Sequence, residues 1–331
     1  MRRNKYRVIA FTATSAAFLT ATIADVRLVA AQEYPSRPIT MVVPFPAGGA
    51  GDSIARTVAE RMRLSLGQPV VIENVTGASG NLGTSRVARA APDGYMLAYG
   101  GMQTHIINGA AMTLRYDVVR DFSPISLMTN APLVIVAKKA TPADSLGDLV
   151  AWLKANPDKV SMGTGGMAAT SHLAGVLFQR QTGTRFGFIP YRSSSMPDLI
   201  AGQIDMLFDP AINALPPMRA GSIKGYAVTA SRRLAAAPDV PTVDEAGVAG
   251  IHVSNWTALF APKGTSNAVV TKLNAAVVEA LADTAVHKRL MSLGLELFPR
   301  ERQGPDALAA FHQAEIERWW PIIKAAGIKA E

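Results

Sequence analysis

The sequence contains no cysteine. This excludes disulfide bonds, zinc–thiolate sites, thiol nucleophiles and lipid anchors attached through sulfur. The fold must therefore depend on a hydrophobic core alone, and a chain of roughly 300 residues is long enough to bury one. Long apolar runs are missing too, because after residue 31 no stretch approaches the ~20 apolar residues that a membrane span requires. We expect the chain beyond residue 31 to be soluble.

Motifs of catalysis and of nucleic-acid binding are also missing. The sequence has no G-x-S-x-G nucleophile elbow, no H-E-x-x-H metal motif and no P-loop lysine. Its histidines number only five, and His287 and His312 have no obvious serine partner. Lysines and arginines are not clustered among aromatic residues, so we expect no nucleic-acid partner. These features favour a binding protein without metal or cofactor over an enzyme, with an exported hydrolase as the alternative.

The N-terminal residues have the pattern of a signal peptide. Four basic side chains lie within residues 2–7, and residues 8–24 are small and apolar. Residues 29–31, Val-Ala-Ala, then place small side chains at the −3 and −1 positions of a cleavage site. An uncleaved anchor helix is the alternative, but the apolar run is short and rich in alanine and threonine. We predict a signal peptide at residues 1–31 and a mature protein in the periplasm of a Gram-negative bacterium.

Net charge points to the same division of the chain. The whole sequence carries +8, and residues 1–31 contribute +4 of it, which leaves about +4 for the remainder. A mild positive charge is compatible with small anionic ligands, and it is also ordinary for a solvated surface.

Strand-like and helix-like segments alternate along the rest of the chain. Residues 39–43 and 95–99 are typical of strands, whereas residues 171–181 and 306–326 are typical of helices. This alternation predicts an α/β fold with mostly parallel sheets flanked by helices.

The length of the chain favours two lobes over one. We expect residues 32–131 and 258–331 to form lobe 1, and residues 132–257 to form lobe 2. In such an arrangement ligands bind beyond the carboxyl ends of the strands, in a cleft between the lobes.

Glycines cluster directly after the first predicted strand, in the segment Pro44–Asp52. A helical pattern follows with Ile54, Val58 and Met62, and Asp52 is the expected N-cap. Glycines let the backbone approach a ligand, and a helix start offers unpaired N–H groups and a positive dipole end to an anion. A tight turn without any ligand uses the same residues, so both interpretations stay open.

A second glycine-rich segment, Met162–Leu173, repeats the order of strand, loop and helix. Thr170 or Ser171 is the expected helix cap. Two helix starts, one from each lobe, would then face one cleft and hold a carboxylate from both sides. Two ordinary turns are the alternative.

The chain also carries stretches whose combination and order are highly specific: VVPFPAGGAGDSIAR, GQPVVIENVTGASGNLG, AAPDGYMLAYG, YDVVRDFSPISL, MGTGGMAATSHLAGVLF, IPYRS, DLIAGQIDMLFD, VPTVDEAG and FAPKGTS. In this order and spacing the chain resembles the Bug family, the substrate-binding proteins of tripartite tricarboxylate transporters. The resemblance covers essentially the whole chain after the signal peptide.

The resemblance implies a type II periplasmic-binding-protein fold with two α/β lobes that close on a small carboxylic acid. It further implies a monomeric periplasmic receptor that delivers a mono-, di- or tricarboxylate to the membrane subunits of the transporter. A sensory binding protein that presents its ligand to a sensor kinase would have the same fold and cleft, so this alternative stays open.

In this family, backbone N–H groups of two loops and bridging waters hold the ligand carboxylate. On this chain the resemblance implies contacts from Phe45, Ala47, Gly48, Gly49 and Asp52 in the first loop, and from Gly163, Thr164, Thr170 and Ser171 in the second. Asp209, after the DMLF strand, looks like the family's water-orienting aspartate. A bare carboxylate would repel an anionic ligand, so a water between them is the sensible arrangement.

Other positions depart from the family pattern and are expected to set specificity. Ala78 and Ser79 lie on a loop expected near the cleft, and Ser193 follows the PYR motif in place of the usual glycine. Ser193 and the two serines after it contact the ligand or cap the next helix. His105 contacts the far end of the ligand or is a structural histidine. The identity of the acid depends on these positions.

Overall fold

The structure is a computed structural model that describes residues 33–191 and 193–329. The signal peptide predicted for residues 1–31 lies outside the described residues. Arg37–Glu331 form one compact unit of the chain. Within the described residues, no helix is both long enough and apolar enough to cross a membrane.

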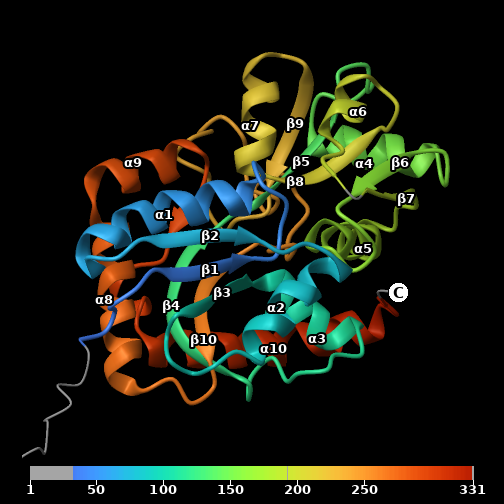
Figure 1. Cartoon of the computed structure of the whole chain (residues 1–331). Helices are drawn as coiled ribbons and strands as arrows, with labels where there is room; N and C mark the ends of the chain where they lie inside the picture. Colours follow the sequence, from blue (N-terminus) through green and yellow to red (C-terminus); the bar gives the residue numbers. More distant parts are fainter. Residues whose placement is uncertain (1–32, 192, 330–331) are drawn as a thin grey trace, which may run out of the picture. The chain divides into compact units, whose positions relative to one another are not determined.

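Two mixed β-sheets organise this unit (Figure 1). The first has the strand order β11-β4-β10-β3-β1-β2, with β1 (Ile39–Val43), β2 (Val70–Asn74), β3 (Met96–Gly101), β4 (Phe122–Asn130), β10 (Thr257–Pro262) and β11 (Glu296–Leu297). The second has the order β7-β6-β8-β5-β9, with β5 (Leu133–Lys138), β6 (Ser161–Thr164), β7 (Gly187–Pro190), β8 (Met206–Pro210) and β9 (Ile223–Val228).

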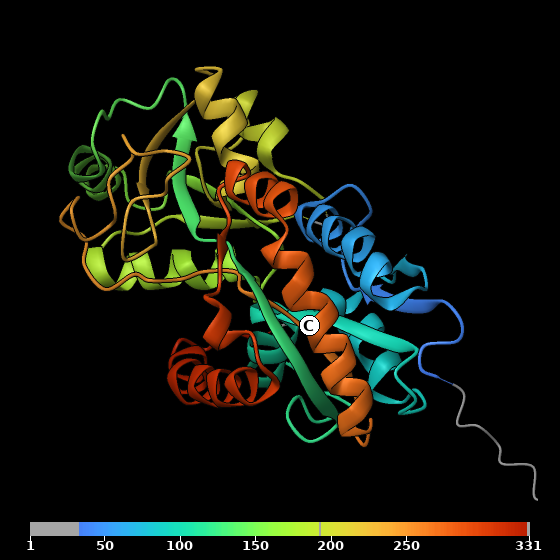
Figure 2. The ribbon, with the colours of Figure 1, turned by 90° about the vertical axis from the view of Figure 1, so that its left-hand side faces the viewer.

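Helices connect the strands and cover the sheets. Those joining or covering strands of the first sheet are α1 (Ala50–Leu66), α2 (Asn81–Ala88), α3 (Asn108–Ala111), α8 (Asn267–Ala282), α9 (Thr284–Ser292) and α10 (Pro305–Ala325). Those of the second are α4 (Leu146–Ala155), α5 (Thr170–Thr182), α6 (Met196–Ile200) and α7 (Ala211–Arg219). Short helical turns lie at Ala78–Gly80, at Met102–Ile107, which is π-helical, and at Arg300–Arg302. Helix α8 runs alongside β4 (Figure 2).

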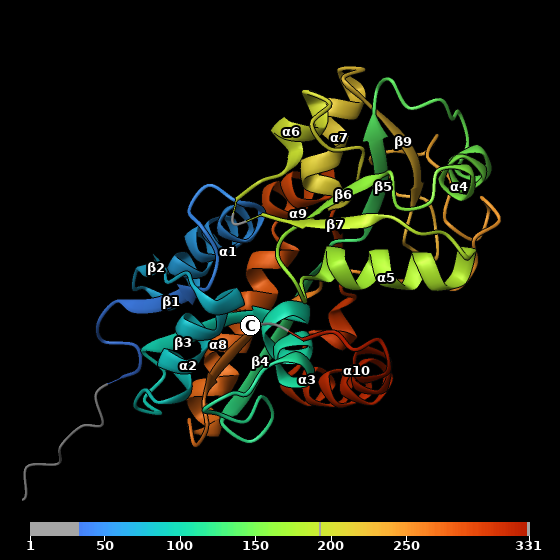
Figure 3. The same ribbon diagram turned by 90° about the vertical axis from the view of Figure 1, so that its right-hand side faces the viewer.

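The pattern of buried residues in β5 explains why helices cover both faces of the second sheet. Leu133, Ile135 and Ala137 belong to the cluster that contains α5 side chains, whereas Val134 and Val136 belong to the cluster built with α6 and α7. Successive side chains of a strand point to opposite faces, so a run that is apolar at every position requires cover on both sides. Figure 3 shows α5 beside this sheet.

The two-sheet α/β architecture agrees with the sequence, but the sheets are more mixed than the expected mostly parallel arrangement. The pairs β1/β2, β1/β3, β6/β7 and β6/β8 are parallel, and the other pairs of the described strands are antiparallel. Most of the antiparallel pairs involve β5 or β10. Each of these strands comes directly after the chain has crossed from one sheet to the other. A strand that has just crossed starts where its neighbours end, as the pairs Leu133↔Pro210 and Thr257↔Gly101 show.

The crossings also bear on the proposed lobes. Ala131 and Pro132 separate β4 from β5, and residues 229–256 separate β9 from β10. The division at residues 131/132 and 257/258 stays a proposal. Thr257, which the sequence analysis assigns to the end of lobe 2, opens β10 in the first sheet.

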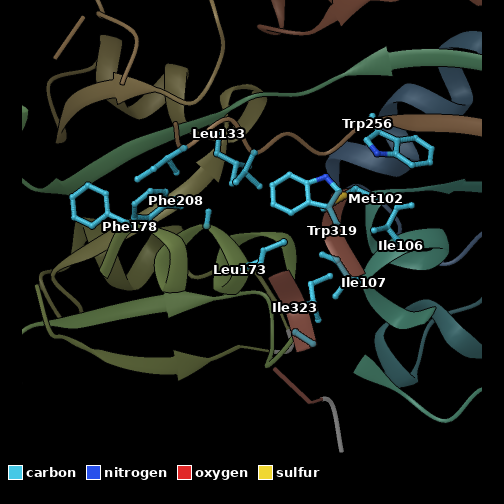
Figure 4. Close-up of a cluster of buried hydrophobic side chains, with 14 of the residues drawn as sticks. Met102, Ile106, Ile107, Leu133, Leu173, Phe178, Phe208, Trp256, Trp319 and Ile323 are labelled. Carbon is cyan, nitrogen blue, oxygen red and sulfur yellow. The ribbon is translucent and has the colours of Figure 1, made fainter. Parts of the chain in front are cut away.

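One hydrophobic cluster continues from one sheet to the other (Figure 4). Phe178 and Phe208 contribute from the elements of the second sheet, and Ile107, Trp319 and Ile323 contribute from the elements around the first. Each is at most 2% exposed. A continuous close-packed core of this kind limits relative movement on the side of the molecule where α10 lies.

A pair of histidines lies within this apolar region. The ring of His105 stacks on Phe260 with centroids 4.0 Å apart. The ring of His312 lies edge-on to the His105 ring, with centroids 5.7 Å apart. Burial lowers the pKa of His105 well below its ordinary value, and the neighbouring His312 lowers it further. Burial also lowers the pKa of His312, although hydrogen bonding to the His105 carbonyl and the charge of Asp117 oppose this shift. Both rings are therefore neutral in the folded protein.

We expect acid to destabilise the fold through these histidines. Unfolded histidines take up protons near pH ~6.5, whereas His105 resists protonation, so lowering the pH below this value favours the unfolded state by up to about 1.4 kcal/mol per pH unit for each such histidine. His105→Phe should make the slope of unfolding free energy against pH shallower by one such contribution. Urea unfolding from about pH 7.5 to about pH 5.5 measures the slope.

His287→Gln, which replaces an exposed histidine on α9, is the control for substitution of a histidine as such. A slope that His105→Phe does not alter would contradict the assignment of His105 as a buried neutral group.

Candidate ligand-binding site

A cavity of about 680 Å³ lies where strands of both sheets end. This volume is within the range of roughly 300–1,000 Å³ that is usual for small-molecule sites. Its wall includes the loop after β1, the end of β3, the loop after β6, the end of β8 and residues 255–257 at the return crossing. The antiparallel entry of β5 and β10 brings Leu133 and Thr257 to the same place.

The first glycine loop forms one wall of the cavity through Phe45 to Gly51. Gly48 has a φ of +77°, a conformation in which a Cβ would be strained. The N-cap of α1 is Gly49 and the helix begins at Ala50. The expectation that Asp52 is the N-cap is therefore wrong: Asp52 is the third helical residue.

Asp52 instead ties the loop to its own helix. Its Oδ2 accepts a hydrogen bond from the Gly48 N–H at 2.9 Å and one from Arg56 Nε at 2.9 Å. Its Oδ1 accepts from Asn74 Nδ2 at 3.0 Å, and the same amide donates to the Phe45 carbonyl at 3.0 Å. Burial by itself raises the pKa of Asp52, but the hydrogen bonds from Arg56, Gly48 and Asn74 outweigh it and hold the pKa below the ordinary value. Asp52 is thus ionised, and its oxygens are occupied within the loop.

The N–H groups of Ala50 and Gly51 remain available at the cavity. They are the first two of α1, and they donate to no acceptor in the described part of the chain, as is usual at a helix start. Together with the positive end of a helix of 17 residues, they give this part of the cavity wall a positive electrostatic potential.

The second glycine loop is built in the same way from different side chains. Ser171 Oγ accepts a hydrogen bond from the Gly165 N–H at 3.1 Å, and His172 Nδ1 accepts from the Ala168 N–H at 3.3 Å. Burial lowers the pKa of His172, so its ring is neutral and can accept. Neither Thr170 nor Ser171 is the cap that the sequence predicted, because the N-cap is Ala169 and α5 begins at Thr170.

The N–H groups of Thr170 and Ser171 therefore hold the positions in α5 that Ala50 and Gly51 hold in α1. Neither donates to an acceptor among the described residues, and both residues line the cavity. The starts of two helices, each with unpaired N–H groups, thus face a single cavity.

A hydrogen-bonded chain connects the second loop with the elements of the first sheet. Gln103 Nε2 donates to the Ala168 carbonyl at 3.2 Å and to Asn108 Oδ1 at 2.9 Å. Asn108 Nδ2 in turn donates to the Ser79 carbonyl at 3.0 Å. Ala168 and Ser79 both have positive φ, of 64° and 53°. These hydrogen bonds therefore support two backbone positions that are strained for residues other than glycine.

Asp209 places a titratable group in the cavity wall. It lies at the end of β8 and accepts a hydrogen bond from Asn213 Nδ2 at 3.4 Å. Burial raises its pKa to about 6, and the bond from Asn213 opposes this shift. Near neutral pH this carboxyl group can therefore take up or release a proton.

Nine predicted site residues line the cavity: Phe45, Ala47, Gly48, Gly49, Gly163, Thr170, Ser171, Ser193 and Asp209. Five do not: Asp52, Ala78, Ser79, His105 and Thr164. The reasons are local. Asp52 bonds to its own loop, and the Thr164 hydroxyl likewise donates to the Gly166 carbonyl. Ala78 and Ser79 form a helical turn behind Asn108, and His105 is buried against Phe260.

Other cavity residues were not singled out from the sequence, notably Tyr99, Asn213 and Asn255, whereas Gln103 was expected at the cleft only as part of the segment 103–105. Gln103 lies two residues before His105, and the π-helical turn determines which of them faces the cavity. Asn213 could have been found, because it follows Asp209 closely where the chain passes from β8 into α7. Among the described residues, no group of three or more His, Asp or Glu side chains is arranged to hold a metal ion.

Comparison with known proteins gives a family for this arrangement. The family model of the tripartite tricarboxylate transporter family receptor matches residues 54–328 of this chain. A protein from the TAR-I ttuE–ttuC' intergenic region of Agrobacterium vitis is 40% identical over 94% of this chain and 91% of that protein. BugT of Bordetella pertussis is 35% identical over 91% of this chain and 93% of its own length.

Solved structures have the same fold. MatC from Rhodopseudomonas palustris, with bound malate, is 38% identical with a TM-score of 0.82, over 88% of this chain and 100% of that one. The periplasmic binding protein BugD is 37% identical with a TM-score of 0.82, over 90% and 100%. An R. palustris protein with adipate is 33% identical with a TM-score of 0.83, over 89% and 99%. These findings confirm the fold class and the resemblance that the sequence predicts. The chain belongs to the receptor family of tripartite tricarboxylate transporters.

Proposed function

We propose that this chain is a periplasmic receptor that captures a small carboxylic acid between its two glycine loops. The observation that carries the proposal is the pair of helix starts, at Ala50 and Thr170, whose unpaired N–H groups line one cavity. Membership of the receptor family supports it, as do the malate and the adipate held by two related proteins.

A carboxylate suits these donors for physical reasons. Its two oxygens can accept from the N–H groups of both loops, and each helix start favours an anion by about 0.3–1 kcal/mol even at an exposed position. The N–H groups carry no net charge, so binding does not require the desolvation of a charged side chain. Water between the ligand and Asp209 would separate two groups of like charge. The chain binds its ligand and does not transform it.

The same contacts explain how a bound ligand would bring the two loops closer together. A ligand that reaches the donors of both loops favours the state in which the loops are close, so binding shifts the population toward that state. We propose that the closed receptor, a monomer in the periplasm, then passes the acid to the membrane subunits of a tripartite tricarboxylate-type transporter.

A ligand screen tests the proposal. Residues 32–331 should unfold at a higher temperature in the presence of at least one organic acid among malate, adipate, succinate, citrate, benzoate and glutamate. A ligand present at ~100 times its dissociation constant adds about 2.7 kcal/mol to the stability. The fully methylated ester of the same acid should give no shift, because it has no carboxylate.

Ala47→Glu locates the binding position within this screen. Ala47 is exposed at the rim of the first loop, so glutamate can be accommodated there but repels an anion, and we expect at least ~10-fold weaker binding by calorimetry. Ala310→Glu, on the exposed face of α10, should bind as the wild type does. Lack of any shift with all the acids contradicts the proposal, and unchanged binding by Ala47→Glu moves the site away from the first loop.

Asp209 should make binding depend on pH. Its pKa of about 6 means that it is largely ionised above neutral pH. An anion bound nearby disfavours the ionised form, so binding should take up a proton and affinity should rise as the pH falls from about 7.5 to about 5.5. Asp209→Asn should remove this dependence. Calorimetry with one acid on both proteins cancels the ligand's own titration, and an identical pH dependence of the two proteins would exclude Asp209 from the site.

A further inference from the structure

Asp52 places a negative charge next to the N–H groups that are proposed to hold an anion. It is the third residue of α1, directly after Ala50 and Gly51, and it bonds to the N–H of Gly48. All three of these neighbours line the cavity. A carboxylate at this place would repel an anionic ligand if nothing balanced its charge.

Arg56 supplies the balancing charge from the next turn of the same helix. Its Nε donates to Asp52 Oδ2 at 2.9 Å, on the same oxygen that accepts from Gly48. The Asp52 side chain is 5% exposed, whereas that of Arg56 is 53% exposed. The hydrogen bond to Asp52 raises the pKa of Arg56 despite some desolvation, so the arginine stays charged. The charges of Asp52 and Arg56 therefore nearly cancel, and the pair presents little net charge to the first loop.

Asn74 joins this pair to the other end of the loop. At the end of β2, it donates to Asp52 and to the Phe45 carbonyl and accepts from Arg56 Nη2 at 3.2 Å. The carbonyl of Phe45 and the N–H of Gly48 are therefore fixed by one network. The N–H groups of Ala50 and Gly51, which line the cavity, take no part in this network and have no acceptor within residues 33–191 and 193–329.

The second loop shows that a charge is not needed for this kind of support. There the neutral hydroxyl of Ser171 accepts from the N–H of Gly165 at 3.1 Å. The first loop uses a carboxylate for the equivalent bond, and it therefore needs a partner that cancels the charge.

We propose that Asp52 and Arg56 are positioning residues for the ligand: Asp52 sets the geometry of the first loop, and Arg56 neutralises Asp52 so that an anion can approach. The inference rests on the proposed function, because it requires an anionic ligand at this loop. Neither side chain needs to touch the ligand.

Charge and hydrogen bonding can be separated by amide substitutions. Arg56→Gln keeps a donor near Asp52 but removes the positive charge, and it should weaken binding of the acid found in the screen about 10-fold. Because added salt screens repulsion, affinity in this variant should fall less with rising NaCl than in the wild type. The double variant Asp52→Asn with Arg56→Gln has no unpaired charge and keeps an acceptor for Gly48. It should bind within about 3-fold of the wild type.

Arg63→Gln is the matched control. Arg63 lies on the same helix, pairs with Glu60 and is not among the residues that line the cavity. Its affinity and salt dependence should equal those of the wild type, and thermal unfolding of all variants checks that they fold.

The outcomes separate the two proposals. If the wild type binds no carboxylate, the proposed function fails and the inference fails with it. If the wild type binds but Arg56→Gln binds equally well, only the inference is overturned. If the double variant binds more weakly than Arg56→Gln, the pair acts as a purely structural contact, which also overturns the inference.

Discussion

Each glycine loop depends on a side chain of the following helix that accepts a hydrogen bond from the loop's own backbone. Asp52 does this for Gly48, and Ser171 does it for Gly165. These bonds satisfy N–H groups of the turns, while the first two N–H groups of each helix donate to no acceptor among the residues that the structure describes. A backbone that is fixed in advance loses little entropy when a ligand arrives. The site thus owes its donors to loop geometry more than to charged side chains.

The topology brings the two loops to one cavity. Strands β1, β3, β6 and β8 end at it, whereas β5 and β10 begin there after the chain has crossed between the sheets. The crossing strands must therefore run against their neighbours, which is why the sheets are mixed. On the side of α10 the hydrophobic cluster continues between the two sets of elements, with Phe178, Trp319 and Ile323 buried. This continuous packing joins the two sets of elements on that side of the cavity.

Much of this arrangement was predictable from the sequence, and the failures have local causes. Glycine after an apolar run marked both loops, and nine of the residues chosen there and elsewhere line the cavity. Asp52 has the residue type of an N-cap, but a glycine can also occupy that position, and only the structure shows that Gly49 does. Gln103 and His105 are close in sequence, and a π-helical turn, which has no clear sequence signature, decides that Gln103 faces the cavity. Hydropathy patterns identify strands but not their direction, so the antiparallel entry of β5 and β10 was not foreseen.

The central claim is that backbone N–H groups at two helix starts hold one ligand, and amide NMR tests it most directly. Titration of isotope-labelled protein with the acid found to bind should move the amide proton signals of Ala50 and Gly51 downfield, together with those of Thr170 and Ser171. All four should follow a single binding curve, because one ligand contacts both loops. Saturation with shifts confined to one loop, or with none of the four signals displaced, would contradict the account.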